Sequence, residues 1–309
     1  MLKTIFTIAF ITSRMMYPGI PVIPTQAGGE TTDFSNVSQS VRSDVAYDGS
    51  DEPAVNFLMP GENAKPLKIN MLRINKAQSK DSAANRPGGP VINLYSGVGN
   101  AVEKGQPKSL DRTELKSMAM GVIGNEHGFA GHTQRSAKLP KVMTSAKAEG
   151  TYAFETNFAD KVTAEVKGAY LAPTELLDLQ KGYDLTKPLP LKWKPVEGAV
   201  GYAVNAEGSV KGARVRWTAG AMESHVDAMF PGKVPPEVFK KNIKTWLLPA
   251  KTCECVIPAG IFNGSTTIKV SVTAYGAPDI RDTAAGIVNI VYKSTVTAPI
   301  SAAREETAK

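Results

Sequence analysis

Residues 189–204, LPLKWKPVEGAVGYAV, decide the fold class of this 309-residue chain. Large apolar side chains alternate with others from Leu189 to Trp193, a Pro-Val-Glu-Gly-Ala corner follows, and the alternation resumes at Tyr202 and Val204. Successive side chains of a strand point to opposite faces of a sheet, so this spacing buries one face of each strand. The stretch therefore predicts two strands of a β-sandwich.

The same alternation recurs along the chain and predicts a mainly β fold. Residues 266–275, TTIKVSVTAY, place Ile268, Val270 and Val272 on one face and polar side chains such as Lys269 on the other. Hairpins are expected where two such runs flank turn residues. The expected strands are residues 54–59 paired with 67–74, then 91–95, a hairpin within 150–173, 214–218, 266–275 and 287–296.

A few segments favour helices instead. A helix is expected over residues 235–248, because two prolines suit a first helical turn and Phe239 and Trp246 fall on one apolar face. Shorter helical segments are expected over residues 114–120 and, as a single turn, within the linker 174–184.

Residues 189–204 resemble the opening strands of fibronectin type III-like domains, which occur in many secreted bacterial proteins. In that family a Trp on the second strand and a Tyr on the third point into the core, and Trp193 and Tyr202 stand at those places. The resemblance covers about residues 185–298, although the helix expected before Leu248 departs from the family pattern. It implies a β-sandwich used for adhesion, spacing or ligand presentation, usually without catalysis.

The length of the chain suggests about two domains. We expect two β-sandwich-like domains, the second of them fibronectin type III/Ig-like with a helical insertion. The expected organisation is a signal peptide over residues 1–27, a flexible lead-in over 28–53, an N-terminal β-rich domain over 54–173, the fibronectin type III-like domain over 185–298 and a tail over 299–309.

The N-terminus has the composition of an export signal. Lys3 precedes a short apolar run over residues 5–11, no acidic residue occurs before Glu30, and Ala27 ends a small-residue site. The run is too short for a transmembrane helix, so we expect no transmembrane segment after signal removal. These features predict a secreted, periplasmic or cell-surface protein. The alternative is an ordinary buried N-terminal strand.

The basic residues are spread thinly. The net charge is +7, and removing residues 1–27 leaves +5. Nucleic-acid-binding proteins usually gather basic residues on one face with interleaved aromatics, whereas here only small clusters occur at residues 135–141 and 240–244. We therefore expect a solvated positive surface and no nucleic-acid partner.

One cluster could bind a metal. Glu126, His127 and His132 lie in a Gly-rich stretch, and imidazole and carboxylate are zinc ligands. Their spacing is not the H-E-x-x-H pattern that puts two histidines on one helix face. They are weak metal candidates beside the alternative of exposed loop histidines.

Only two cysteines exist, Cys253 and Cys255. On a strand their thiols share a face, and a bond between them requires a strained backbone. A disulfide, an intermolecular or metal-bound pair, and two free thiols all remain open.

No nucleophile elbow, P-loop or dinucleotide-binding motif occurs. We therefore predict no catalytic residues, no cofactor and a non-enzymatic role in envelope or extracellular binding or assembly, with a protein or glycan partner or a second copy of the chain. The alternatives are a carbohydrate-binding module, for which Trp217 and Tyr275 are candidate stacking residues, a self-assembling surface subunit built through residues 28–53, and a metal-dependent hydrolase.

Overall fold

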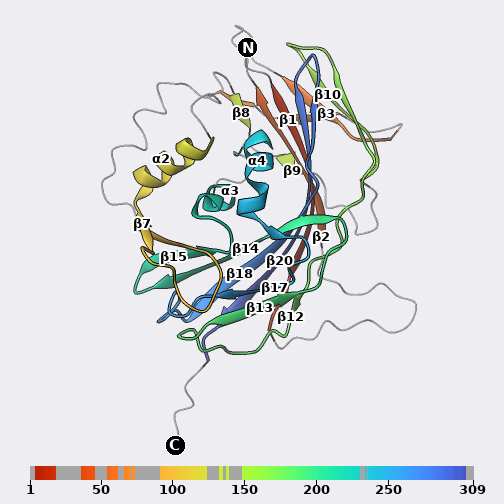
Figure 1. Ribbon diagram of the computed structural model, residues 1–309. Coiled ribbons are helices and arrows are strands. Elements are labelled where there is room, and N and C mark those ends of the chain that lie inside the picture. The colour runs from red at the N-terminus through yellow and green to blue at the C-terminus, as the bar shows by residue number, and fades with distance from the viewer. Residues whose placement is uncertain are drawn as a thin grey trace, which may run out of the picture.

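The computed structural model describes residues 4–18, 36–45, 54–61, 66–69, 71–73, 91–123, 132–134, 137–138, 148–229, 234 and 236–303. These residues form a mainly β structure with one large curved sheet, two smaller sheets and short helices (Figure 1). The prediction of a mainly β, sandwich-like fold is confirmed.

Within the described ranges the large sheet has thirteen strands, and its central path runs β5-β8-β2-β1-β20-β18-β14-β15-β6-β7. β16, β19 and β9 pair with strands of this path. The bounds are β1 Ile5–Met15, β2 Asn36–Val45, β5 Met71–Arg73, β6 Ile92–Ser96, β7 Lys108–Leu110, β8 His132–Gln134, β9 Ala137–Lys138, β14 Ala199–Val210, β15 Ala213–Thr218, β16 Leu248–Pro249, β18 Thr267–Gly276, β19 Asp279–Asp282 and β20 Ile287–Ser301.

Two smaller sheets cover one face of the large sheet. The first has the order β11-β10-β3-β4 and the second the order β12-β13-β17. Their bounds are β3 Val55–Leu58, β4 Leu67–Ile69, β10 Gly150–Thr156, β11 Val162–Val166, β12 Leu176–Leu177, β13 Leu189–Trp193 and β17 Glu254–Ile257. Val288 and Ile290 of β20 join the core beneath the first sheet, and Val296 and Ile300 join the core beneath the second. The same face of β20 thus serves both sandwiches.

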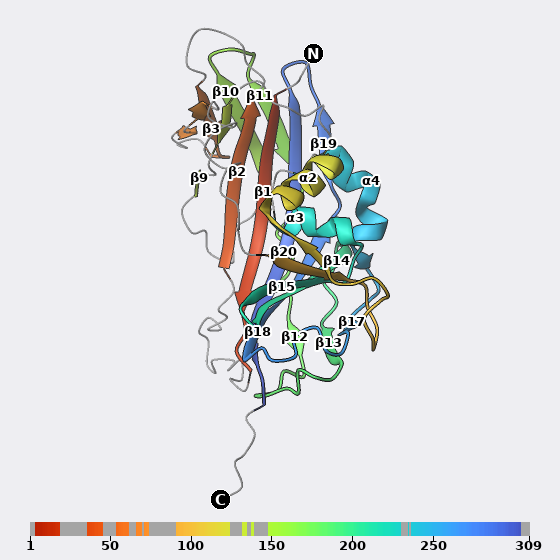
Figure 2. The ribbon, with the colours of Figure 1, turned by 90° about the vertical axis from the view of Figure 1, so that its left-hand side faces the viewer.

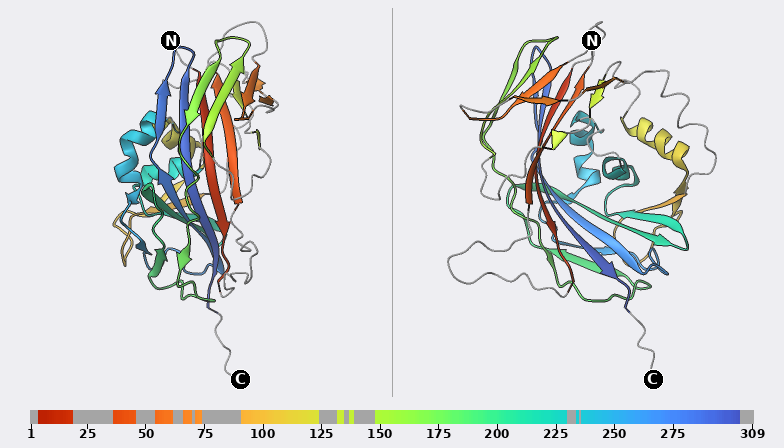
Figure 3. Two further views of the ribbon diagram at one scale, coloured as in Figure 1. Left: turned by 90° about the vertical axis from the view of Figure 1, so that its right-hand side faces the viewer. Right: turned by 180° about the vertical axis from the view of Figure 1, so that it is seen from behind.

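The helices lie on the opposite face of the large sheet, which is its concave side and is called the hollow face below (Figures 1 and 3). They are α2 Arg112–Ile123, the 3-10 helix η2 Met222–Ser224, α3 His225–Met229 and α4 Pro236–Trp246. Figure 2 shows α2, α3 and α4 together on one side of the long strands β1 and β20. Asp111 caps α2, because its carboxylate accepts the backbone N–H groups of Thr113 and Glu114 while Glu114 accepts that of Asp111.

Most of the expected elements are confirmed. The hairpins β3–β4 and β10–β11, the strands β6, β15 and β18 and the helix α4 lie where alternation and proline placed them. The strand expected over residues 67–74 is divided, because β4 pairs with β3 whereas β5 pairs with β8 in the large sheet. The helix expected to reach residue 248 ends at Trp246. The helical turn expected within residues 174–184 is wrong, because Leu176 and Leu177 form β12 and pair with β13. β20 also continues to Ser301, beyond the expected end at residue 296.

Trp193 and Tyr202 both point into the core, as the resemblance implies. Each is 1% exposed, and their ring centroids lie 5.4 Å apart. Trp193 comes from β13 of the three-stranded sheet and Tyr202 from β14 of the large sheet. The Tyr202 hydroxyl accepts the backbone N–H of Val196 at 2.8 Å, which holds the corner between the two strands.

The predicted signal segment contains a central strand in this structure. β1 pairs in parallel with β20 and antiparallel with β2, and Phe6, Ile8 and Phe10 are fully buried. This is the arrangement of the alternative, a buried N-terminal strand. Export and cleavage stay predictions. Among the described residues, no helix is long and apolar enough to cross a membrane.

The large sheet draws strands from both expected domains. β6 of the expected N-terminal domain pairs in parallel with β15 of the expected second domain, and β1 pairs with β20. The domain boundaries stay a prediction, but the two halves share this one sheet.

Candidate functional site

The hollow face of the large sheet carries polar side chains in register. On β14, β18 and β20, alternate residues enter the core, so the residues between them face the hollow. Glu207 of β14 lies directly opposite Arg216 of β15 on one side and Lys269 of β18 on the other. The strand register therefore places one carboxylate between two cations.

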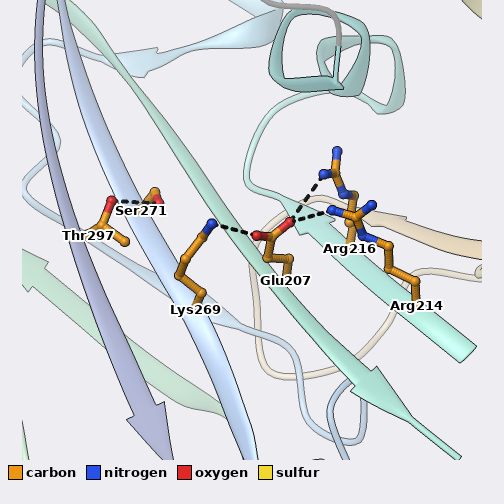
Figure 4. A network of polar contacts seen from close by, with 6 residues as sticks. All are labelled: Glu207, Arg214, Arg216, Lys269, Ser271 and Thr297. Atoms are coloured by element: carbon orange, nitrogen blue, oxygen red, sulfur yellow. Dashed lines mark hydrogen bonds and ion pairs between the residues drawn. The ribbon is translucent and has the colours of Figure 1, made fainter. Parts of the chain in front are cut away.

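Figure 4 shows the resulting cluster of ion pairs. Arg214 and Arg216 each donate an Nη2–H to Oε2 of Glu207 at 3.1 Å, and Lys269 donates from Nζ to Oε1 at 2.6 Å. We call these four residues the Glu207 cluster. Three cations surround one carboxylate, so the cluster carries an excess of positive charge.

Partial burial and charge act on the Glu207 cluster in opposite directions. Burial raises the pKa of Glu207, but hydrogen bonds from Lys269 and Arg214 outweigh it and lower the pKa below its usual value. Burial lowers the pKa of Arg216, as does the neighbouring Arg214, while Glu207 opposes both. Arg216 is thus the most buried cation of the cluster, and Arg214 and Lys269 are the more exposed ones.

Hydroxyl side chains continue the polar face beside this cluster. Ser271 and Thr297 share a hydrogen bond of 3.2 Å, and Thr273 and Thr295 share one of 2.9 Å. Asn205 of β14 lies directly opposite Ser271 of β18. These groups are partly buried and can donate or accept hydrogen bonds toward the hollow.

A shallow groove of about 550 Å³ opens at the Glu207 cluster. Glu207, Arg214 and Lys269 contribute its charged lining, and the rest is mainly apolar. The remaining lining residues are Met15, Tyr17, Gly208, Thr267, Ile268 and Pro299. Two cations of the cluster, Arg214 and Lys269, are therefore accessible from solvent through this groove.

The other end of the polar face is closed by helices α3 and α4. Here Asp227 of α3 accepts the hydroxyl of Tyr275 at 2.8 Å, and Phe239 of α4 packs on the Tyr275 ring with centroids 5.1 Å apart. The Nζ of Lys293 lies 4.7 Å from the centroid of the same ring. These groups line a small pocket of about 160 Å³.

Burial raises the pKa of Tyr275 well above its usual value, and the Asp227 charge raises it further, so the phenol stays protonated and donates to Asp227. His225 is also deeply buried, and its Nε2 lies 2.9 Å from the carbonyl oxygen of Tyr95. Burial lowers the pKa of His225 to about 4, so it is neutral at pH 7 and Nε2–H donates to that carbonyl. Both side chains fix α3 to the sheet.

The predicted metal candidates are only partly described. Glu126 and His127 lie outside the described residues. His132 begins β8, where its backbone pairs with Val45 and Arg73. Within the described ranges, no group of three or more His, Cys, Asp or Glu side chains could hold a metal ion. The zinc hypothesis stays a prediction.

The two cysteines are free thiols in this structure. Cys255 lies on β17 with its side chain in the core, and Cys253 precedes that strand and is partly exposed. Burial raises the pKa of Cys255 to about 12, and the nearby Glu254 charge adds to this effect.

The candidate stacking residues are placed away from solvent. Trp217 is fully buried and donates its indole N–H to the carbonyl of Gly97 at 2.8 Å. Tyr275 is also buried, and Phe239 of α4 packs on its ring. Neither ring offers an open face to a sugar, so the structure does not support stacking at these two positions.

The residues of the Glu207 cluster were not singled out from the sequence. Alternation does place Lys269, Arg214 and Arg216 on the outward faces of their strands, and this is the sequence feature from which the cations could have been predicted. The position of Glu207 between them depends on the register of three strands. A scan against protein-family models finds no match to this chain, and a search of curated proteins finds no relative.

Proposed function

We propose that this is an exported, non-enzymatic binding protein of the cell envelope or extracellular space, and that its hollow polar face binds a carboxylate-bearing glycan. The N-terminal apolar run after Lys3 supports export. The Glu207 cluster carries the binding part of the proposal, because its three cations outnumber its one carboxylate and two of them, Arg214 and Lys269, are about half exposed.

Arginine favours this ligand chemistry. A guanidinium is planar and always charged, and it matches the two oxygens of a carboxylate. Arg214 and Lys269 are the most exposed members of the cluster, with side chains 49% and 55% exposed. They can turn toward a ligand while Arg216 keeps its contact with Glu207.

The Ser and Thr hydroxyl groups of β18 and β20 favour a glycan over an acidic peptide as the ligand. Ser271, Thr273, Thr295 and Thr297 present a series of hydroxyl groups next to the cations. Such groups exchange hydrogen bonds with sugar hydroxyls, since each can both donate and accept. A ligand with repeating hydroxyls and carboxylates complements both parts of the face.

The fold supports a presentation role. The sheet β12-β13-β17 faces the strands β15-β14-β18-β20 of the large sheet across the core that holds Trp193 and Tyr202. We infer that these strands form the fibronectin type III-like unit suggested by residues 189–204. In such a unit the sheets act as a rigid support, which suits ligand presentation better than a mobile site.

Isothermal titration calorimetry of the purified protein with oligogalacturonate tests the proposal. We expect binding that weakens as salt is raised, and at least a tenfold loss of affinity in Arg214→Ala and Lys269→Ala. Methyl-esterified oligogalacturonate, which keeps the sugar rings but loses the charge, should not bind. Lys187→Ala is the matched control, because Lys187 pairs with Asp184 away from the hollow face.

Equal binding of the esterified and free forms would refute the role of the cations. Binding of polyglutamate without binding of oligogalacturonate would refute the glycan and favour an acidic protein partner.

A further inference from the structure

We propose that, once residues 1–27 have been removed, an extended segment of another protein chain takes the place of β1 in the large sheet. The inference rests on the proposed export, because only cleavage of the signal removes β1. It adds a second interaction site, which lies at β20 and is distinct from the Glu207 cluster.

The backbone of β20 requires a neighbour at this position. β1 pairs with β20 in parallel from Ile5 opposite Ile287 to Met15 opposite Thr297. The pairing is extended at both ends, because Ile287 N–H donates to the Thr4 carbonyl and Met16 N–H donates to the Thr297 carbonyl, each at 2.9 Å. Without β1 this edge of β20 exposes unpaired backbone groups, which form a template for strand addition.

The side chains of β1 show what the vacated slot would accept. Phe6 stacks on Phe154 with centroids 4.5 Å apart, and Phe10 stacks on Tyr292 with centroids 5.3 Å apart. Ile8 lies between them and is fully buried. An occupant therefore needs large apolar side chains at three alternate positions.

The far end of the slot is polar and adds specificity. The Thr12 hydroxyl donates to the Leu171 carbonyl at 2.7 Å, and Arg14 pairs with Glu175 at 3.2 Å with only 7% of the arginine side chain exposed. An occupant thus continues with a hydroxyl and then a cation at the next two alternate positions. The slot therefore contacts five side chains of its occupant, of which three are apolar, one carries a hydroxyl and one is basic.

The neighbouring strand β2 is a poor replacement for β1. The side chains that it sends toward the core include Val37, Gln39 and Val41, which are smaller or polar. They cannot fill the space of two phenylalanines beside Phe154 and Tyr292. A segment of another chain with the β1 pattern fits the slot, whereas β2 leaves a cavity.

The test uses the chain that begins at Gly28 and a synthetic peptide of residues 4–17, TIFTIAFITSRMMY. We expect one peptide to bind per chain and to raise the Tm, and to convert any oligomer of the truncated chain to a monomer in light scattering. The peptide with Ile8→Lys should lose at least a hundredfold in affinity. The peptide with Ala9→Lys is the matched control, because Ala9 points to the opposite, partly exposed face.

A second protocol avoids dependence on folding of the truncated chain. A protease site between residues 27 and 28 of the full chain allows β1 to be cut from the folded protein. We expect a fluorescent copy of the peptide to exchange into the cut protein and the Ile8→Lys peptide not to exchange. A folded, cut protein that binds neither peptide overturns the inference, as does one that binds both equally.

Mass spectrometry of the protein recovered from its host separates the two proposals. A chain that retains residues 1–27 overturns export and, with it, this inference. A chain that lacks them but does not bind the peptide overturns the slot alone and leaves export standing.

Discussion

Replacing Glu207 by Gln tests the central electrostatic feature of the hollow face. Glutamine keeps the shape of the side chain but removes the charge that Arg214, Arg216 and Lys269 share. The three cations then repel one another without a carboxylate between them. We expect a less stable protein whose cations are more available to an anionic ligand.

The size of the effect follows from burial. A hydrogen bond to a charged group contributes about 1.5–3 kcal/mol, whereas an exposed ion pair contributes about 0.2–1 kcal/mol. Glu207 is 29% exposed and Arg216 is 17% exposed, but the other two cations are about half exposed. We expect Glu207→Gln to lower the free energy of unfolding by roughly 1–3 kcal/mol at pH 7.

The sign of the pH dependence follows from the lowered pKa of Glu207 in the folded state. The stabilisation by its carboxylate is complete above the unfolded pKa of about 4.3 and is lost as the pH falls through the lower folded pKa. The difference in unfolding free energy between the wild type and Glu207→Gln should therefore shrink below about pH 4.

Urea unfolding at several pH values, followed by circular dichroism, measures these differences. Glu155→Gln is the control, because Glu155 forms an exposed pair with Lys161 at 3.0 Å and should change the free energy of unfolding by less than about 0.5 kcal/mol. Equal effects of the two substitutions would refute the special role of Glu207. Weaker binding of oligogalacturonate by Glu207→Gln would show that Glu207 aids the ligand and does not compete with it.

Further predictions concern buried groups. Because burial lowers the pKa of His225 to about 4, stability should fall as the pH drops from about 6.5 toward 4, and His225→Gln should remove this dependence in urea titrations. Phe154→Ala should lower the free energy of unfolding by about 3–5 kcal/mol, since the ring packs on Phe57 in the core, while the exposed Thr151→Ala should have little effect. Because burial raises the pKa of Cys255 to about 12, iodoacetamide at pH 8 should alkylate only Cys253 in the folded protein and both thiols in urea, as intact-mass measurement can show.

Local pattern was sufficient to predict most strands. In β18, Val270 and Val272 are fully buried while Lys269 is exposed, as strict alternation requires. The linker shows where local pattern fails. Leu176, Leu177 and Leu179 suggested a helical turn, but three residues are too few to set a period, and pairing with β13 determines the conformation of Leu176 and Leu177.

Long-range register could not be predicted, and the candidate site depends on it. Alternation shows that Lys269 and Arg216 face outward, but it does not show that β14 lies between their strands. A shift of one residue in β14 would turn Glu207 into the core and bring Ala206 to the surface. The cluster therefore arises from pairing between strands that are separate in sequence.

The N-terminal segment was ambiguous because an export signal and a buried strand both need a short apolar run. The two differ in the order of residues that they require, because a signal needs only mean apolarity whereas a buried strand also needs apolar residues at alternate positions. Exchanging neighbours within residues 6–11 keeps the composition and moves each large side chain to the other face. The substitutions are Phe6→Thr, Thr7→Phe, Ile8→Ala, Ala9→Ile, Phe10→Ile and Ile11→Phe.

This exchanged chain should still be exported and cleaved, because its mean apolarity is unchanged. A peptide of residues 4–17 with the same exchanges should bind the chain from Gly28 at least tenfold more weakly, because Phe side chains no longer reach Phe154 and Tyr292. Cleavage is read by intact mass and binding by calorimetry. Loss of export with binding intact would contradict both expectations and would mean that the order of residues 6–11 serves the signal and not the sheet.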